Sequence, residues 1–424
     1  MNASPAAAPT LLDGTTGARA VRTPWLLLTL VGMGGLFSGI TGPLLSAFVP
    51  PLVREVLGDR RTEIGIVMSI DNVLLLLLVP LAGALSDRAS RHSRLPLIVG
   101  GYLLAAVGMA VMPWAGAAGL AGLVTALIIL HTGTNLSRAP FQALLADAVP
   151  SRFRSLAAGS ATFQMCVGAI AFLMLGQLFG MRPAFLAAAG TVLVVTLALA
   201  AGLRSRSGAA TPTEEPSLRS LLGVLRAAFT GAVPGLRAVF VASLLLQLTF
   251  QTFTTWYALH GTERFRVGPE AIVAGMIAWA VGGVIGALPA GAIGVRIGRR
   301  RTMLLGFALM AGVLFALDRV SSLTMMAPML ALASACWTLP MTNAYPLFVE
   351  PIPRQHRGVL AALYLLSMAL GGAVGDPLNG RLFDLFDGYR PMFLMMSAYT
   401  VLALVAVLLI PQGAGEADTG PDRG

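Results

Sequence analysis

The chain alternates long apolar runs with short polar segments that are rich in arginine. A helix needs about 20 apolar residues to cross a lipid bilayer, and lipid offers no hydrogen-bond partners to an open strand. Each run of this length therefore predicts one transmembrane helix. The runs predict twelve helices, at residues 24–48, 64–86, 95–114, 118–146, 155–179, 183–203, 236–260, 270–294, 302–318, 322–348, 358–382 and 389–411.

The composition favours a chain whose main solvent is lipid. Hydrophobic residues make up 56% of it and charged residues only 11%, against about 25% charged residues in soluble domains. The net charge of +10 does not indicate a nucleic-acid-binding protein, because the 29 basic residues lie in short clusters between apolar runs. All of them are arginine, which favours a GC-rich bacterial source. We therefore expect a multi-pass protein of a bacterial cytoplasmic (inner) membrane.

The arginines also predict the orientation. With the N-terminus in the cytoplasm, the cytoplasmic segments carry about twice as many arginines as the opposite segments, as the positive-inside rule requires. An even number of helices places both termini on one side, so both are expected in the cytoplasm. The polar segment that precedes the first apolar run predicts no cleavable signal peptide.

The two halves of the chain repeat one another. The segment Asp147–Arg154 follows the fourth predicted helix, and Glu350–Arg357 follows the tenth with its acid, proline and arginine at the same spacing. Gly176–Phe179 and Gly380–Phe383 match in the same order, as do the Arg-Pro pairs at 182–183 and 390–391. These matches indicate duplication of a six-helix unit.

The duplication predicts five segments. They are a disordered cytoplasmic N-terminus (1–23), an N-terminal six-helix bundle (24–203), a cytoplasmic linker (204–235), a C-terminal six-helix bundle (236–411) and a cytoplasmic tail (412–424). Within the linker, Ser217–Phe229 has leucines on one side and flanking arginines, which is typical of an interfacial amphipathic helix. A simple linker with incidental leucines is the alternative.

The loop between the second and third predicted helices reads Gly83-Ala-Leu-Ser-Asp87-Arg88-Ala-Ser-Arg91. It resembles the signature loop of the major facilitator superfamily, a glycine and an acid followed by basic residues. The resemblance implies an all-α membrane protein of two pseudo-symmetric six-helix bundles that transports by alternating access. It also implies that these charged residues form a cytoplasmic gate. The alternative is that they serve only to orient the protein in the membrane. The gate residues would be Asp87, Arg88, Arg91, Asp147, Arg154, Glu350 and Arg357.

The stretches Ile70-Asp71-Asn72 and Asn135–Ser155 are similar to the glycoside–pentoside–hexuronide and sucrose-transporter branch of that superfamily. The branch implies uptake of a sugar or glycoside coupled to a cation. Sodium-coupled melibiose-type members carry acids on the second helix, where this chain has Leu75 and Val79. The resemblance therefore does not extend to a sodium site at that place.

Asp71 and His131 lie at similar depths in two helices of one bundle, by their equal distance from Asp87 and Asp147. A carboxylate and an imidazole that lie close together exchange a proton near neutral pH. We hypothesise that Asp71 carries the coupling proton with His131 as its partner. The alternatives are an aspartate bonded to Asn72 or to backbone, and a histidine that serves helix packing.

Polar and aromatic residues within the predicted helices suit a polyhydroxylated ligand, by stacking and by paired hydrogen bonds. Arg138 would bind substrate or gate the transporter, or else would join two helices. Trp256 fits an interfacial aromatic belt. The candidate substrate-binding residues are Asn72, Asn135, Arg138, Gln142, Gln164, Gln247, Gln251, Asn343, Tyr345, Tyr364, Asp376 and Asn379.

No catalytic triad, zinc motif or nucleotide fingerprint is present in the sequence, so we expect neither an enzyme nor a cofactor. Cys166 and Cys336 are expected to be free thiols. The sequence favours a monomeric, proton-coupled symporter of a sugar-like solute, with a small-molecule substrate, a proton and the lipid bilayer as its partners. A proton-driven exporter of drugs or metabolites is the alternative, followed by a receptor that has lost transport.

Overall fold

The computed structural model describes residues 25–89, 94–149, 154–203, 235–349 and 357–410, and these residues form helices and short connections only. The first half contains α1 (Trp25–Leu57), α2 (Arg61–Met68), α3 (Ile70–Ala89), α4 (Leu95–Ala115), the 3-10 turn η1 (Gly116–Ala118), α5 (Gly119–Ala148), α6 (Arg154–Phe179) and α7 (Met181–Leu203). The second contains α9 (Leu236–Phe265), α10 (Pro269–Ile297), α11 (Arg299–Leu317), α12 (Leu323–Val349), α13 (Arg357–Leu385) and α14 (Met392–Leu408).

These helices make twelve crossings, as the apolar runs predict. The second crossing is divided into α2 and α3 by a turn at Ser69, a break that the sequence pattern does not predict. Nine described stretches are long and apolar enough to span a membrane, and one of them, Leu95–Leu144, contains both α4 and α5. The shorter α14 and the more polar α13 complete the set.

Some helices extend beyond their apolar runs. The predicted first helix ends at residue 48, whereas α1 continues to Leu57 through Pro50 and Pro51. Likewise α9 continues to Phe265, past a predicted end at residue 260. The added part of α1 is mostly apolar, with Val49 and Val53 fully buried, and packing therefore continues this helix past its predicted end.

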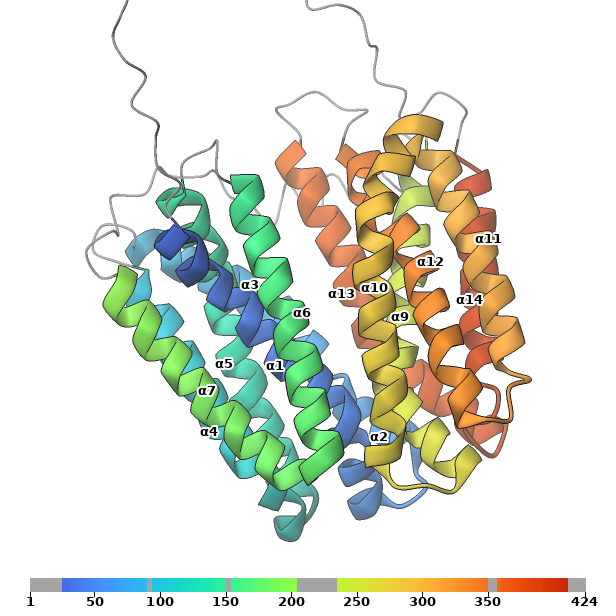
Figure 1. The fold of residues 1–424 in the computed structure, drawn as a ribbon, viewed down its shortest axis with the longest axis horizontal. Helices are drawn as coiled ribbons and strands as arrows, with labels where there is room; N and C mark the ends of the chain where they lie inside the picture. The colour runs from blue at the N-terminus through green and yellow to red at the C-terminus, as the bar shows by residue number, and fades with distance from the viewer. Residues whose placement is uncertain (1–24, 90–93, 150–153, 204–234, 350–356, 411–424) are drawn as a thin grey trace, which may run out of the picture.

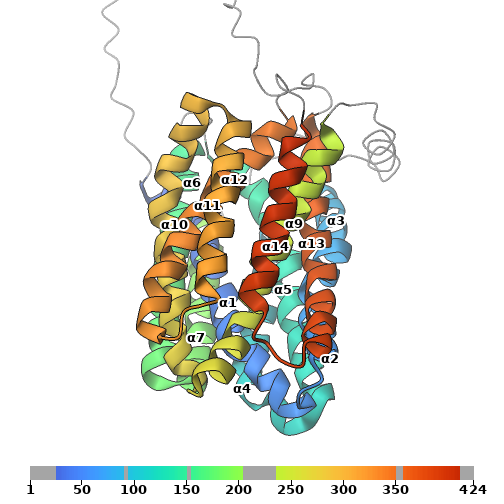
Figure 2. The same ribbon diagram turned by 90° about the vertical axis from the view of Figure 1, so that its right-hand side faces the viewer.

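The two halves are separate bundles with the same helix pairing (Figure 1). In the first half α1 packs on α6 and α7, α3 packs on α5, and α4 packs on α5 and α7. In the second half α9 packs on α13 and α14, α10 on α12, and α11 on α12 and α14. The repeated motifs occupy equivalent places, because Gly176–Phe179 ends α6 and Gly380–Phe383 lies at the end of α13. Both turns lie at the end of the molecule far from the start of α1 and the end of α14 (Figures 1 and 2).

The halves share a core at this end, which we call the outer end because the sequence predicts cytoplasmic termini. One cluster of buried side chains contains residues of both halves, including Phe48, Phe185, Trp256 and Phe393. A second cluster, around Phe240 and Phe307, contains residues of the second half alone. Toward the opposite end, where α1 begins and α14 ends, the ribbons of the two halves diverge (Figure 1).

Two glycines bring α2 of the first half into backbone contact with α13 of the second. A Cβ atom on Gly65 would collide with the carbonyl oxygen of Asp376, and one on Gly380 would collide with that of Arg61. Further along the same pair of crossings, Gly372 packs against the side chain of Asn72. We call this contact between α2–α3 and α13 the glycine seam.

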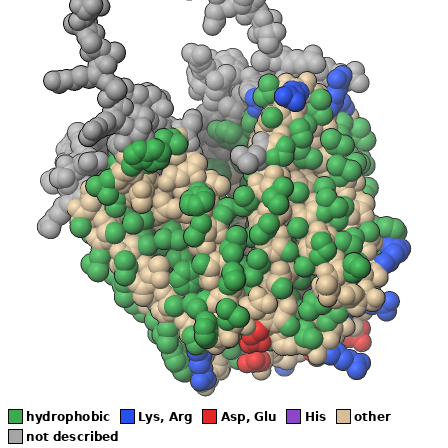
Figure 3. All heavy atoms as spheres, in the orientation of Figure 1, with side chains coloured by type: hydrophobic (Ala, Val, Ile, Leu, Met, Phe, Trp, Pro, Cys, Tyr) green, Lys and Arg blue, Asp and Glu red, His purple; other side chains and the backbone are tan. Residues whose placement is uncertain are grey.

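Apolar side chains cover much of the visible surface, and charged ones gather near its top and along its lower edge (Figure 3). Large apolar side chains such as Leu197 and Phe163 are about 70% exposed. Such exposure is expected where lipid surrounds the helices. The predicted N-terminal segment 1–23, the interfacial helix Ser217–Phe229 and the tail 412–424 lie outside the described residues.

Replacement of Gly380 tests the seam. The variant Gly380→Val should force α2 and α13 apart and lower the stability of the folded protein by about 1–3 kcal/mol, as overpacking usually does. Thermal unfolding in detergent measures the loss. Gly100→Val is the control, because nothing lies within 4 Å of a Cβ at Gly100. Equal melting temperatures for the two variants would contradict a close backbone contact.

Candidate functional site

A polar cluster joins α3 and α5 in the first half. His131 Nδ1 lies 2.9 Å from Asp71 Oδ1, and Asn135 Nδ2 donates a hydrogen bond of 3.1 Å to the same oxygen. His131 and Asn135 are one turn apart on α5, so both face the neighbouring α3. The expected proximity of Asp71 and His131 is present, and Asn135 is a further partner. The Asp71 side chain is 41% exposed, so the cluster is open to a small solute.

The polar face of α5 continues beyond this cluster. Arg138 and Gln142 follow Asn135 at helical spacing, and both side chains are exposed. Arg138 also interacts electrostatically with Asp71. An exposed guanidinium in the middle of a membrane crossing is costly in lipid, and it suits a hydrated site.

A second polar group lies in the other half, on α13 and α9. The Asp376 side chain is fully buried, and its Oδ2 accepts a hydrogen bond of 2.8 Å from Gln251 Nε2. Gln251 also lies 3.3 Å from Thr255 Oγ1. Among the described residues, Asp376 Oδ1 has no hydrogen-bond partner. Asp71 interacts electrostatically with Asp376, so the polar groups of the two halves act on one another across the glycine seam.

A row of stacked aromatic rings lies beside this second group. Phe253 stacks on Trp279 with ring centroids 4.1 Å apart, and Phe250 stacks on Trp337 at 5.0 Å. Trp279 and Trp337 are 6.4 Å apart, which joins the two pairs across α9, α10 and α12. The ring nitrogen of the partly exposed Trp337 has no acceptor among the described residues. That nitrogen atom is itself buried, as are Phe253 and Trp279, so the row is an apolar wall of which Phe250 and Trp337 are the partly exposed members.

Three of the candidate substrate-binding amides are used in helix packing. Asn343 donates to the carbonyl oxygens of Leu339 at 2.9 Å and Ala290 at 3.3 Å. Asn379 donates to Thr252 Oγ1 and accepts from Tyr399, and it is fully buried. Gln164 donates to the carbonyl oxygen of Thr29 at 3.1 Å. These amides tie neighbouring helices together.

The other candidates are dispersed. Asn72 lies in the glycine seam against Gly372, and Gln247 packs against Gly371. Tyr345 of α12 and Tyr364 of α13 make an edge-to-face pair with ring centroids 5.4 Å apart. Neither helix contributes a residue to the Asp71 cluster.

Five of the predicted gate residues belong to described helices, at the end of the molecule where α1 begins and α14 ends. Asp87 and Arg88 belong to α3, and Asp147 belongs to α5. Arg154 begins α6 and Arg357 begins α13. The structure does not describe the side chains of these five residues, and Arg91 and Glu350 lie outside the described residues.

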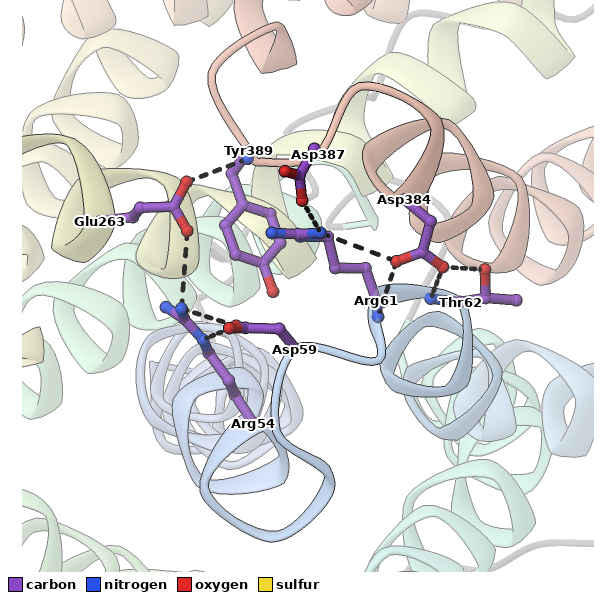
Figure 4. A network of polar contacts seen from close by, with 8 residues as sticks. All are labelled: Arg54, Asp59, Arg61, Thr62, Glu263, Asp384, Asp387 and Tyr389. Carbon is purple, nitrogen blue, oxygen red and sulfur yellow. Dashed lines mark hydrogen bonds and ion pairs between the residues drawn. The ribbon is translucent and has the colours of Figure 1, made fainter.

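A network of charged residues joins the two halves at the outer end (Figure 4). Arg54 at the end of α1 forms an ion pair of 2.7 Å with Asp59 and reaches Glu263 of α9 at 3.5 Å. Arg61 lies 3.5 Å from Asp387 of the second half. We call this set, with Thr62, Asp384 and Tyr389, the outer network.

Asp384 closes the N-terminus of α2 from the opposite bundle. Its carboxylate accepts hydrogen bonds from the backbone nitrogens of Arg61 at 3.2 Å and Thr62 at 3.0 Å, and from Thr62 Oγ1 at 2.5 Å. The first N–H groups of a helix have no partner within the helix, and a carboxylate there also meets the positive end of the helix dipole. The cap is therefore an inter-half bond that is lost when the halves separate.

Tyr389 fills the middle of the outer network. The guanidinium groups of Arg54 and Arg61 lie 5.4 Å and 5.3 Å from its ring centroid, and its backbone nitrogen donates to Glu263 at 3.2 Å. Trp256 is fully buried beside this ring, with ring centroids 5.8 Å apart. The interfacial position expected for Trp256 is therefore wrong: it packs inside the second bundle, where Tyr389 covers it.

Asp384 lies near the end of α13, beyond its apolar part. Its electrostatic interactions favour the arrangement in which the two halves are in contact at the outer end. Burial alone would raise the pKa of its carboxyl group, but the hydrogen bonds from Thr62 and Arg61 and the positive charge of Arg61 hold that pKa below its usual value. The carboxylate form is therefore stabilised by contacts from the first half.

Sequence reasoning treated the arginines of the outer network as charges of an outer loop and did not find the network. The sequence did contain a signal for it. Acids and arginines occur in loops of both halves that are predicted to lie on the same side of the membrane, where they could form ion pairs. Among the described residues, no group of three or more His, Cys, Asp or Glu side chains could hold a metal ion. Cys166 and Cys336 are free thiols.

The comparison with solved structures agrees with this architecture. A bacterial homologue of the human lysosomal transporter Spinster, in an inward-facing and unoccupied conformation, matches with a TM-score of 0.73 and 15% identity, over 92% of this chain and 98% of that one. A point mutant of the nucleoside transporter NupG matches with a TM-score of 0.74 and 13% identity, over 90% of this chain and 99% of that one. At these identities the likeness shows the fold alone.

No curated protein sequence matches the chain significantly. The sequence model of the Major Facilitator Superfamily matches residues 31–287 and 274–423, which together cover most of the chain. Both halves of the duplicated fold fall within these matches. The chain therefore belongs to the Major Facilitator Superfamily and is a multi-pass membrane transporter, not an enzyme.

Proposed function

We propose that this transporter is a proton-coupled symporter of a sugar or glycoside-like solute. The observation that carries the proposal is the contact of 2.9 Å between His131 Nδ1 and Asp71 Oδ1 at an accessible place in the first bundle. A histidine changes its charge near neutral pH, and a carboxylate at this distance responds to that change. Protonation of the pair would alter its attraction for Arg138, which lies on the same face of α5.

The substrate would bind between the halves, against the polar face of α5. The exposed Arg138 and Gln142 supply hydrogen-bond donors at helical spacing, which suits hydroxyl and ring oxygens, while the buried Asn135 holds the Asp71 carboxylate in place. The aromatic row of the second half would stack on the apolar face of a sugar ring.

We assign the described conformation to the inward-facing state of the cycle. The outer network and the glycine seam hold the halves together at one end, while the ribbons of the halves diverge at the end where α1 begins and α14 ends (Figure 1). With the termini in the cytoplasm of a bacterial cell, the open end faces inward. One chain contains both halves, so a monomer would be the transporting unit.

Proton-driven export of a drug or metabolite is the second candidate. The continuous aromatic row, with Phe253 and Trp279 stacked at 4.1 Å, would suit an apolar or aromatic solute as well as a sugar. The direction of proton-driven flux distinguishes the two candidates, since a symporter accumulates the solute on the side to which protons flow.

Asp71→Asn tests proton coupling in proteoliposomes that carry a pH gradient. The variant should lose accumulation of labelled sugar against a concentration gradient, because the amide cannot accept a proton, while it retains exchange of sugar across the membrane. Glu55→Gln is the control, because Glu55 is an exposed acid outside the cluster. Undiminished uphill uptake by Asp71→Asn would refute this role.

We expect the outer network to act as a gate. Reversal of the charge at Arg54 tests this. Arg54→Glu places a like charge beside Glu263 of the other half, and the partly exposed ion pair between the halves that it removes is worth about 0.2–1 kcal/mol. The ratio of closed to open outer ends should fall on the order of fivefold, since 1.4 kcal/mol is a tenfold change. Spin labels at the exposed positions Glu55 and Arg390 measure the opening by their distance.

The second substitution Glu263→Arg, added to Arg54→Glu, should restore part of the closed population. Arg60→Gln is the matched control, because Arg60 pairs with Glu63 within its own half at 3.3 Å. Equal distances in Arg54→Glu and in the control would show that the network does not hold the gate.

Acid should open the same gate through Asp384. Its pKa is lower in the closed arrangement than the ordinary 3.8, so the carboxylate stabilises closure fully above that value and the stabilisation is lost as the pH falls through the lowered value. The label distance should therefore increase below about pH 4. In Asp384→Asn this acid response should be absent; a response of unchanged size would assign it to another group.

A further inference from the structure

Asp376 is a carboxyl group that the proposed pair of Asp71 and His131 does not use. Its side chain has no exposed surface, and only one of its two oxygens accepts a hydrogen bond, from Gln251 at 2.8 Å. Among the described residues, Oδ1 has no partner and no ion pair involves this group. A buried carboxylate anion with one unsatisfied oxygen is strongly unfavourable, whereas the neutral acid is far less costly to bury.

Among the described residues, no positively charged group acts on Asp376. From α9 it meets Gln251, Thr255 and Trp256, uncharged polar side chains that favour the carboxylate without neutralising its charge. From α2 it meets the backbone at Gly65. The charged group that acts on it is Asp71 of α3, itself an acid, which disfavours a second anion nearby.

We propose that Asp376 is a second protonation site of the transporter, which is loaded from the outer side and then sealed by α2. This inference rests on the proposed proton coupling but concerns a different carboxyl group in the other half. When the seam is open, water reaches Asp376, and its carboxylate takes one proton from a hydronium ion to give the neutral acid and water. Closure of α2 over the acid then removes it from water.

The glycine seam provides the access control. Gly65 packs directly on the backbone of Asp376, so α2 cannot leave α13 without uncovering this residue. The outer network holds the N-terminus of α2 against Asp384, two turns further along α13. Loading of Asp376 and closure of the outer end are therefore one linked event, in which the proton favours the closed state.

The neighbouring groups favour a proton over a metal cation. Hard cations take several oxygen ligands at once. Here the Gln251 side chain turns its N–H group toward the carboxylate, which repels a cation at that oxygen. The neutral acid needs no further ligand, and its own O–H group can serve as a donor.

Two measurements test the inference in the full-length protein in detergent, without a transported solute. Infrared difference spectroscopy at neutral pH should show the C=O band of a protonated carboxyl group in the wild type and in Asp71→Asn, and its loss in Asp376→Asn. A band that persists in Asp376→Asn, or one that is lost in Asp71→Asn, would overturn the assignment.

The spin-label distance between Glu55 and Arg390 is the second measurement. One proton links closure to pH. The ratio of closed to open outer ends should therefore fall by up to about tenfold per pH unit, between the pH at which Asp376 titrates in the open state and the higher pH at which it titrates in the closed state. In Asp376→Asn, which resembles the neutral acid, the outer end should stay closed at all these pH values. Glu270→Gln, an acid at the start of α10, is the control and should respond as the wild type does.

A closed population that responds to sodium at constant pH, or an alkaline response that survives in Asp376→Asn, would overturn the inference. Neither measurement depends on substrate or on uphill transport. Failure of the Asp71 hypothesis would appear in the proteoliposome assay alone, and failure of the Asp376 inference would appear here alone.

Discussion

The contact on which the rest of the structure depends is the backbone packing of α2 against α13. Gly65 and Gly380 allow two helices of opposite halves to approach until main-chain atoms touch. Such closeness gives dispersion contacts along a whole face and leaves no room for water. It fixes the end at which the halves meet, buries Asp376, and brings the N-terminus of α2 within reach of Asp384. The polar groups of the outer network add hydrogen bonds and ion pairs to this close packing.

The number and order of the helices could be predicted from the sequence, because burial in lipid requires long apolar runs that stand out against arginine-rich loops. The repeat of helix pairing follows from the same duplication that the motifs after α5 and α12 indicate. The nearness of Asp71 and His131 was also predictable. It depends only on helical rise and on the equal depth of two residues in parallel helices.

Contacts across the two halves were not predictable in the same way. The pairing of Arg54 with Glu263 and of Thr62 with Asp384 joins residues about 200 or more positions apart, and neither helical periodicity nor hydropathy encodes such pairs. The amides showed a related difficulty. Asn343 and Asn379 were chosen as binding residues because polar groups in a membrane helix are rare, but packing uses such groups too, and only geometry separates the two roles.

The turn at Ser69 gives α2 an unusual position. This eight-residue helix is continuous in sequence with the first bundle, yet its close packing partner is α13 of the second. The six-helix unit that was duplicated therefore differs from the set of helices that pack together, because α2 belongs to the first unit by sequence and to the second by packing. Transplanting one complete half into a related transporter would carry α2 away from the surface that it evolved to fit. A functional chimera would therefore need a junction on each side of α2, before Arg61 and at Ser69, so that α2 stays alongside its native α13.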